Sequence, residues 1–187
     1  MSEKKEFLDI STRQELRAWL EVNHASEKEC WVLINRSKSK VEGRIDYLGL
    51  VEEALCFGWI DSTCKRIEEG TLQRISPRAK RSSWTELNKA RCRRLEKLGL
   101  MREAGRAVLP DLQSFVIDEE IMDELRSDPL VLKNFNAFPE LYKRVRIDNI
   151  QSYKKQKELY EQRLQKFIQK TREGEMYGEW NDGGLLE

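Results

Sequence analysis

The sequence predicts an α+β fold, with a small sheet of at least three strands flanked by helices and a helical C-terminal extension. In the first half of the chain, short continuous apolar runs alternate with amphipathic stretches, which is the pattern of strands mixed with helices. Beyond about residue 113, apolar residues recur only at the three- and four-residue spacing of helices. At 187 residues the chain is long enough to bury a substantial core.

Capping residues and glycines mark two helices near the N-terminus. Thr12 and Glu15 have the spacing of a capping box, so a helix is expected to begin there. Asp46 can cap a second helix that runs to about Phe57, and Gly58 supplies a residue that tolerates the left-handed backbone at a helix end.

Three strands are expected between and after these helices. Residues 30–36 form a continuous apolar run typical of a buried strand, and residues 37–45 read as a polar loop. Residues 59–67 and 71–76 have strand character and are joined across residues 68–70, where Gly70 favours a tight hairpin turn.

The rest of the chain is predicted to be helical. Ser83 and Glu86 form a second capping-box pair, which predicts a helix to about Leu98 that stops at Gly99. Pro129 occupies a favoured first-turn position of a later helix. The remaining helices are expected at 101–109, at 118–126, at 129–136 and, as one long helix, at 139–172.

These elements predict an α+β domain at residues 1–112, a helical part at 113–175 packed on it, and a loose tail at 176–187.

The distribution of charge divides the chain at different positions. The total is +1, but residues 62–108 carry 13 basic and 5 acidic side chains between two acidic flanks.

Composition excludes several classes of protein. No apolar run reaches the roughly 18 residues of a membrane span, and the N-terminal residues lack the apolar centre of a signal peptide. We therefore expect a cytoplasmic protein. The four cysteines match no zinc-binding spacing, so neither metal nor disulfide is expected, and no cofactor motif is present. His24 lies at a predicted helix end, where the helix dipole alone favours it.

The stretch from residue 52 to 105 carries a resemblance to a known family. Its pieces are Glu53–Ser62 (EALCFGWIDS), Gln73–Arg78 (QRISPR), Ser83–Asn88 (SWTELN), and then Gly99, Met101 and Gly105. In order and spacing they resemble the YdeI/OmpD-associated family, also called bacteriocin-protection proteins. Ile75 and Thr85 depart from the residues common there. The resemblance implies a small bacterial cytoplasmic α+β protein with an indirect role in tolerance of bacteriocins or envelope stress, and no established reaction.

One candidate site lies on the predicted hairpin. Trp59 and Asp61 are two residues apart on a strand, so their side chains should share a face. Arg74 lies on the partner strand within plausible reach of Asp61. The pair is either a structural salt bridge or part of a polar pocket in which Arg74 offers a bidentate fork to an anion.

A second candidate is the loop that follows the hairpin. Arg78, Lys80 and Arg81 precede the helix that Ser83 is expected to open, and cations beside free helix amides make an anion site. The alternative is a solvated charge run. Trp84 and Asn88 are four residues apart and would share a helical face toward this loop, although Trp84 also fits an ordinary core position.

These candidates favour a protein that binds a small anionic ligand through Trp59, Asp61, Arg74, Arg78, Lys80, Trp84 and Asn88. One alternative is an enzyme that uses Asp61 as acid or base and Arg74 as electrostatic stabiliser. Another is a nucleic-acid or protein scaffold built on residues 62–108, but the sequence carries no nucleic-acid-binding motif, which disfavours nucleic acid. The ligand and the oligomeric state are left open.

Overall fold

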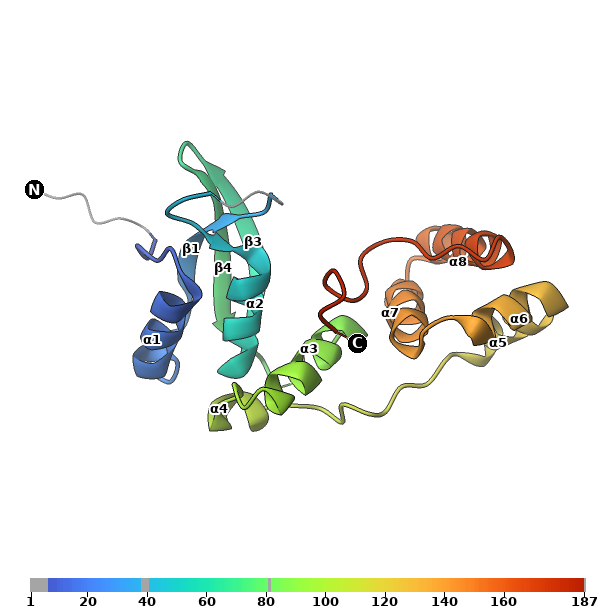
Figure 1. The fold of residues 1–187 in the computed structure, drawn as a ribbon, viewed down its shortest axis with the longest axis horizontal. Helices are drawn as coiled ribbons and strands as arrows, with labels where there is room; N and C mark the ends of the chain where they lie inside the picture. The colour runs from blue at the N-terminus through green and yellow to red at the C-terminus, as the bar shows by residue number, and fades with distance from the viewer. Residues whose placement is uncertain (1–6, 38–40, 81, 187) are drawn as a thin grey trace, which may run out of the picture. The chain divides into compact units, whose positions relative to one another are not determined.

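A computed structural model of the chain describes residues 7–37, 41–80 and 82–186. The chain forms two compact units. The first comprises the residues up to Ser83 together with Arg91–Pro110, and the second comprises Trp84–Ala90 together with the residues from Asp111 onward. The first unit holds a four-stranded sheet with its helices and the second is helical (Figure 1), which confirms the predicted α+β class.

The sheet has the strand order β2-β1-β4-β3. Strand β2 pairs in parallel with β1, whereas β1 with β4 and β4 with β3 are antiparallel. The three predicted strands are confirmed, and β2 is an addition that begins at the last residue of the stretch expected to be loop. The strands are β1 (Cys30–Asn35), β2 (Ile45–Asp46), β3 (Trp59–Ile67) and β4 (Gly70–Pro77).

Helices α1 (Arg13–Asn23) and α2 (Tyr47–Cys56) begin where their caps predict. The Thr12 hydroxyl accepts a hydrogen bond from the amide of Glu15, and the Glu15 carboxylate accepts one from the amide of Thr12. The Asp46 carboxylate accepts a hydrogen bond from the amide of Gly49. Helix α2 packs against β3 and α1. It is buried on every side from Gly49 to Cys56, including its two glutamates.

Two glycines allow the close packing that follows α2. Gly58 has a φ of 74°, which confirms the predicted stop. Gly105, in the short helix α4 (Glu103–Arg106), lies so close to α2 that a Cβ atom there would overlap the carbonyl oxygen of Cys56. A side chain at position 105 would therefore push α4 away from the end of α2.

Helix α3 (Glu86–Lys97) begins two residues later than predicted. The expected capping box at Ser83 is wrong, because Thr85 accepts the hydrogen bond from the amide of Asn88 at 3.2 Å and so caps the helix. The Glu86 carboxylate binds Arg144 instead of turning back to Ser83. The predicted stop at Gly99 is confirmed by its φ of 68°.

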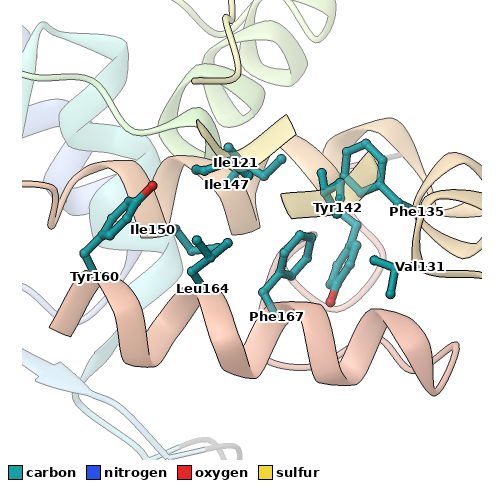
Figure 2. Packing of buried hydrophobic residues seen from close by; sticks show 10 residues of the cluster. Ile121, Val131, Phe135, Tyr142, Ile147, Ile150, Tyr160, Leu164 and Phe167 are labelled. Atoms are coloured by element: carbon teal, nitrogen blue, oxygen red, sulfur yellow. The ribbon is translucent and has the colours of Figure 1, made fainter. Parts of the chain in front are cut away.

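The predicted long helix at 139–172 is also wrong, because the chain turns between α7 (Glu140–Gln151) and α8 (Lys157–Arg172). Residues 152–156 form turns, although no proline or glycine marks them. The turn lets α8 pack back on α7. Figure 2 shows Tyr160, Leu164 and Phe167 extending from α8 toward the side chains of α7. A continuous helix would leave both apolar faces in water.

The second unit has its own hydrophobic core. Helices α5 (Glu119–Arg126) and α6 (Pro129–Ala137) pack against α8 and contribute Ile121, Leu125, Val131 and Phe135. The segment after α8 contacts the same core through Tyr177 and Trp180, and the Trp180 ring meets Tyr142 edge to face. Among the helices of the described residues, none combines the length and the apolar character needed to cross a bilayer.

Candidate functional site

The first unit holds a hydrogen-bonded pair of acidic side chains, Tyr47 and Asp61. Tyr47 is the first residue of α2, and its hydroxyl donates to the Asp61 carboxylate on β3 at 2.7 Å. Burial and the bond to Asp61 raise the pKa of Tyr47 to about 12. The phenol therefore keeps its proton at neutral pH and acts as a hydrogen-bond donor.

Three arginines surround this pair. The Arg36 guanidinium lies over the Tyr47 ring, 4.6 Å from its centroid. Arg91 lies near enough to Tyr47 for its charge to favour a lower pKa of the phenol, and Asp61 lies near enough to Arg78 for its charge to favour a higher pKa of that guanidinium. We call these five residues the Asp61 cluster.

Arg78 and Arg91 are 7% and 8% exposed, which is unusual for arginine. Arg78 donates from its guanidinium to the hydroxyl of Ser82 at 3.1 Å and to the carbonyl of Ser83 at 2.8 Å. Burial lowers the pKa of Arg78, and the charge of Asp61 opposes this shift. The alternative of a fully solvated charge run is therefore wrong for Arg78.

Trp59 shares a face of the sheet with Asp61, as predicted, because the two lie opposite Pro77 and Ile75 in the β3–β4 register. Trp59 itself is only 1% exposed. Its ring packs edge to face on Trp19, and its indole nitrogen donates to the carbonyl of His24. Trp59 is thus a core residue that positions the start of β3.

The predicted approach of Arg74 to Asp61 is wrong. Ile75 lies opposite Asp61 and shares its face, so the neighbouring Arg74 projects from the other face of the sheet. There Arg74 binds Glu29, with 2.8 Å between Nε and Oε2, and also donates to Ser62. An enzyme that combines Asp61 with Arg74 has no support in this geometry.

The loop after β4 differs from the predicted anion site. Lys80 is exposed, and Arg81 lies outside the described residues. Two of the first three amides of α3 already have acceptors, since Glu86 donates to Asp148 at 3.1 Å and Asn88 donates to Thr85. The backbone amides of Glu86 and Asn88 are therefore not free to bind an anion, as the prediction requires.

Trp84 and Asn88 belong to the second unit, whereas the other five predicted residues lie in the first. Trp84 precedes α3 and is half-buried, so its four-residue spacing to Asn88 is not a helical one. Asn88 lies within the first turn of α3 and is 9% exposed. The structure thus brings together Asp61 and Arg78 and separates Arg74 from both.

Sequence reasoning missed the partners of Asp61. Nothing in the sequence marks Arg36, Tyr47 or Arg91, because each reaches the cluster through strand and helix packing rather than through a local motif. The buried glutamates of α2 did carry a signal. Glu52 and Glu53 stand in an otherwise apolar run, which is where a buried, paired carboxylate is expected.

Many cations of residues 62–108 are neutralised within their own unit. Such paired charges do not form the continuous positive face that nucleic acid requires. The ion pairs are Arg74 with Glu29, Lys89 with Glu86, Arg94 with Glu52, Arg102 with Glu21 and Arg106 with Glu96.

The chain is therefore an α+β protein with a buried arginine–carboxylate cluster, extended by a helical unit. Residues 8–108 match a family model described as a domain of unknown function, DUF8412, and because this match covers more than half of the chain, the protein belongs to that family. Residues 114–174 match the model described as bacteriocin-protection, YdeI or OmpD-associated. Curated proteins and solved structures give no significant match.

The YdeI/OmpD-associated resemblance is thus confirmed as a match to part of the chain, and the matched part is the helical region. The residues that carry the resemblance in the sequence, from Glu53 to Gly105, lie in the stretch covered by the other family model. The Asp61 cluster lies in that stretch as well.

Proposed function

We propose that this protein binds a small anion at the Asp61 cluster and acts in the cytoplasm in tolerance of bacteriocins or envelope stress. The match of residues 114–174 to a family described by bacteriocin protection supports the biological role. The described helices include none fit to span a bilayer, which is compatible with the location. Anion binding is argued from the geometry of the first unit.

The burial of Arg78 and Arg91 is the observation that carries the proposal. A guanidinium in a poorly solvated setting attracts an oxyanion more strongly than one in water, and its planar fork matches carboxylate and phosphate oxygens. Among the five residues of the Asp61 cluster, three are arginines and one, Asp61, is a carboxylate, and one oxygen of Asp61 already accepts a hydrogen bond from Tyr47. Positive charge therefore exceeds negative charge within the cluster.

Tyr47 gives the cluster a neutral donor of fixed position. Its hydroxyl is oriented by Asp61, and Arg36 stacks on its ring. An anion bound beside Asp61 would meet the two buried guanidiniums without approaching a second carboxylate of the cluster. The excess positive charge selects for anions.

Thermal unfolding in sodium sulfate against sodium chloride at matched ionic strength tests the proposal. An anion that binds only the folded state stabilises it, by about 2.7 kcal/mol at a hundred times its dissociation constant. Sulfate also stabilises proteins in general by exclusion from their surface. The specific part is therefore the difference between wild type and Arg78→Gln in the same two salts.

Arg74→Gln is the matched control, because Arg74 lies on the same strand but projects from the opposite face and binds Glu29. We expect Arg78→Gln to lose the specific stabilisation and Arg74→Gln to keep it. If sulfate stabilises wild type and both variants by the same amount, the proposal is contradicted.

A further inference from the structure

A second group of charged side chains lies in the first unit, apart from the Asp61 cluster. Its centre is formed by Glu52 and Glu53 of α2, whose side chains are 2% and 5% exposed. Arg13 bridges the two carboxylates, with 2.7 Å from one terminal nitrogen to Glu52 and 2.9 Å from the other to Glu53. A buried carboxylate persists only when it is paired in this way.

Two more arginines complete the pairing. Arg17 binds the second oxygen of Glu53 at 2.7 Å and also donates to the carbonyl of Leu100. Arg94 of α3 binds the second oxygen of Glu52 at 2.8 Å. All four carboxylate oxygens of Glu52 and Glu53 therefore accept a hydrogen bond from a guanidinium. Arg17 also lies 3.9 Å from the carboxylate of Glu21, which pairs with Arg102 as well, so four cations face three anions in this network.

The guanidiniums hold more donors than these carboxylates use. Within the described part of the chain, the Arg94 guanidinium makes one hydrogen bond, through a single terminal nitrogen, although a guanidinium offers five N–H donors. Its side chain is 28% exposed and that of Arg13 is 34% exposed, so both are open to a ligand from solvent.

A cavity of about 280 Å³ opens at these donors. The three arginines line it together with Gln14, Glu53, Leu98 and Leu100. The Glu53 carboxylate is already bound by Arg13 and Arg17. Leu98 and Leu100 lie on either side of Gly99, just after α3 ends at Lys97. Its wall thus combines cationic donors with apolar surface. A ligand that fills it needs one negative charge and a short apolar group.

We infer that this cavity, lined by Arg13, Arg17 and Arg94, binds a monocarboxylate that carries a short aliphatic chain. The carboxylate accepts from Arg94 and supplies the negative charge that three glutamates leave unmatched against four arginines. The aliphatic chain lies against Leu98 and Leu100. The site involves none of the residues of the Asp61 cluster, so this inference is independent of the proposed function.

Butyrate is the probe, with butanol as its uncharged counterpart, and saturation-transfer NMR on the full chain gives the affinity of each. We expect butyrate to bind and butanol not to bind. Arg94→Gln removes a charge-assisted hydrogen bond and should raise the butyrate dissociation constant about tenfold or more. Arg106→Gln is the matched control, since it breaks an exposed pair with Glu96, and Arg78→Gln shows that the Asp61 cluster is not involved. Both should bind butyrate as wild type does.

Glu52→Gln provides a second variant with the opposite expectation. It removes a carboxylate that competes for Arg13 and Arg94, so butyrate should bind more tightly. If the arginines only stabilise the fold, Glu52→Gln should not bind butyrate more tightly than wild type. Absence of butyrate binding to the wild type, equal binding by Arg94→Gln, or no gain in folded Glu52→Gln would each overturn the inference.

Discussion

The four cysteines differ in what surrounds each thiol. Cys30, Cys56 and Cys92 are buried, whereas Cys64 is exposed on β3 next to the register shift of the hairpin. Burial raises the pKa of Cys30 and Cys92 to about 12 and that of Cys56 to about 11. Only the thiolate is reactive, so the three buried thiols should be inert in the folded protein.

We therefore expect Ellman's reagent to modify one thiol in the native protein and all four after denaturation without reductant. Cys64→Ser should abolish the native reaction and leave three thiols in the denatured protein. Native modification that persists in Cys64→Ser would show that a buried cysteine reaches solvent.

The Asp61 cluster could be predicted from the sequence only in part. Asp61 and Arg78 stand in recognisable motif pieces, and the shared face of Trp59 and Asp61 follows from the two-residue period of a strand. The position of Arg74 depends on which residue of β4 lies opposite Asp61. That register is set by pairing across the hairpin and with β1, where Arg74 lies opposite Trp31.

At the scale of elements, α3 shows how a distant side chain determines where a helix begins. Asp148 of α7 accepts the hydrogen bond of the Glu86 amide, so it caps α3 from another helix. Burial raises the pKa of Asp148, and the bond from Glu86 opposes this shift. The cap therefore satisfies a helix amide and buries a charge at the same time.

Asp148→Ala should lower the free energy of unfolding by about 1 kcal/mol, as the loss of a cap does elsewhere. Asp148→Asn keeps an acceptor oxygen and carries no charge, so it should cost less. Because burial holds the pKa of Asp148 in the folded state above its ordinary value, the folded state holds the proton more tightly than the unfolded state. The contribution of Asp148 to stability is therefore largest at low pH and falls as the pH rises through the folded pKa.

Denaturant unfolding at about pH 3 and about pH 7 checks both expectations. Relative to wild type, Asp148→Asn should gain stability between the lower and the higher pH. A difference between the two proteins that does not change with pH would contradict the raised pKa.

At the scale of the whole molecule, each compact unit has its own hydrophobic core. Phe167 lies at the centre of the helical core, where its ring meets Phe135 edge to face and is tilted against Tyr142. Phe167→Ala should destabilise the helical unit by about 3–5 kcal/mol, because it removes a large buried side chain. Val116→Ala, at an exposed position of the same unit, is the control.

Hydrogen exchange should locate the effect of Phe167→Ala. We expect the loss of protection in α5–α8, with β1, β3 and β4 protected as in wild type, because each unit opens around its own core. Equal loss of protection in the sheet would show that the two units unfold as one.

The sequence by itself determined the features that depend on neighbouring residues: the caps at Thr12 and Asp46, the hairpin at Gly70, and the stops at Gly58 and Gly99. These rest on contacts within a few residues, which a linear pattern contains. Tertiary structure alone decided the start of α3, the turn between α7 and α8, and the grouping of arginines around Asp61 and around the glutamates of α2. Each of these depends on burying apolar faces and pairing charges between segments far apart in the chain, and only the folded arrangement brings those segments together.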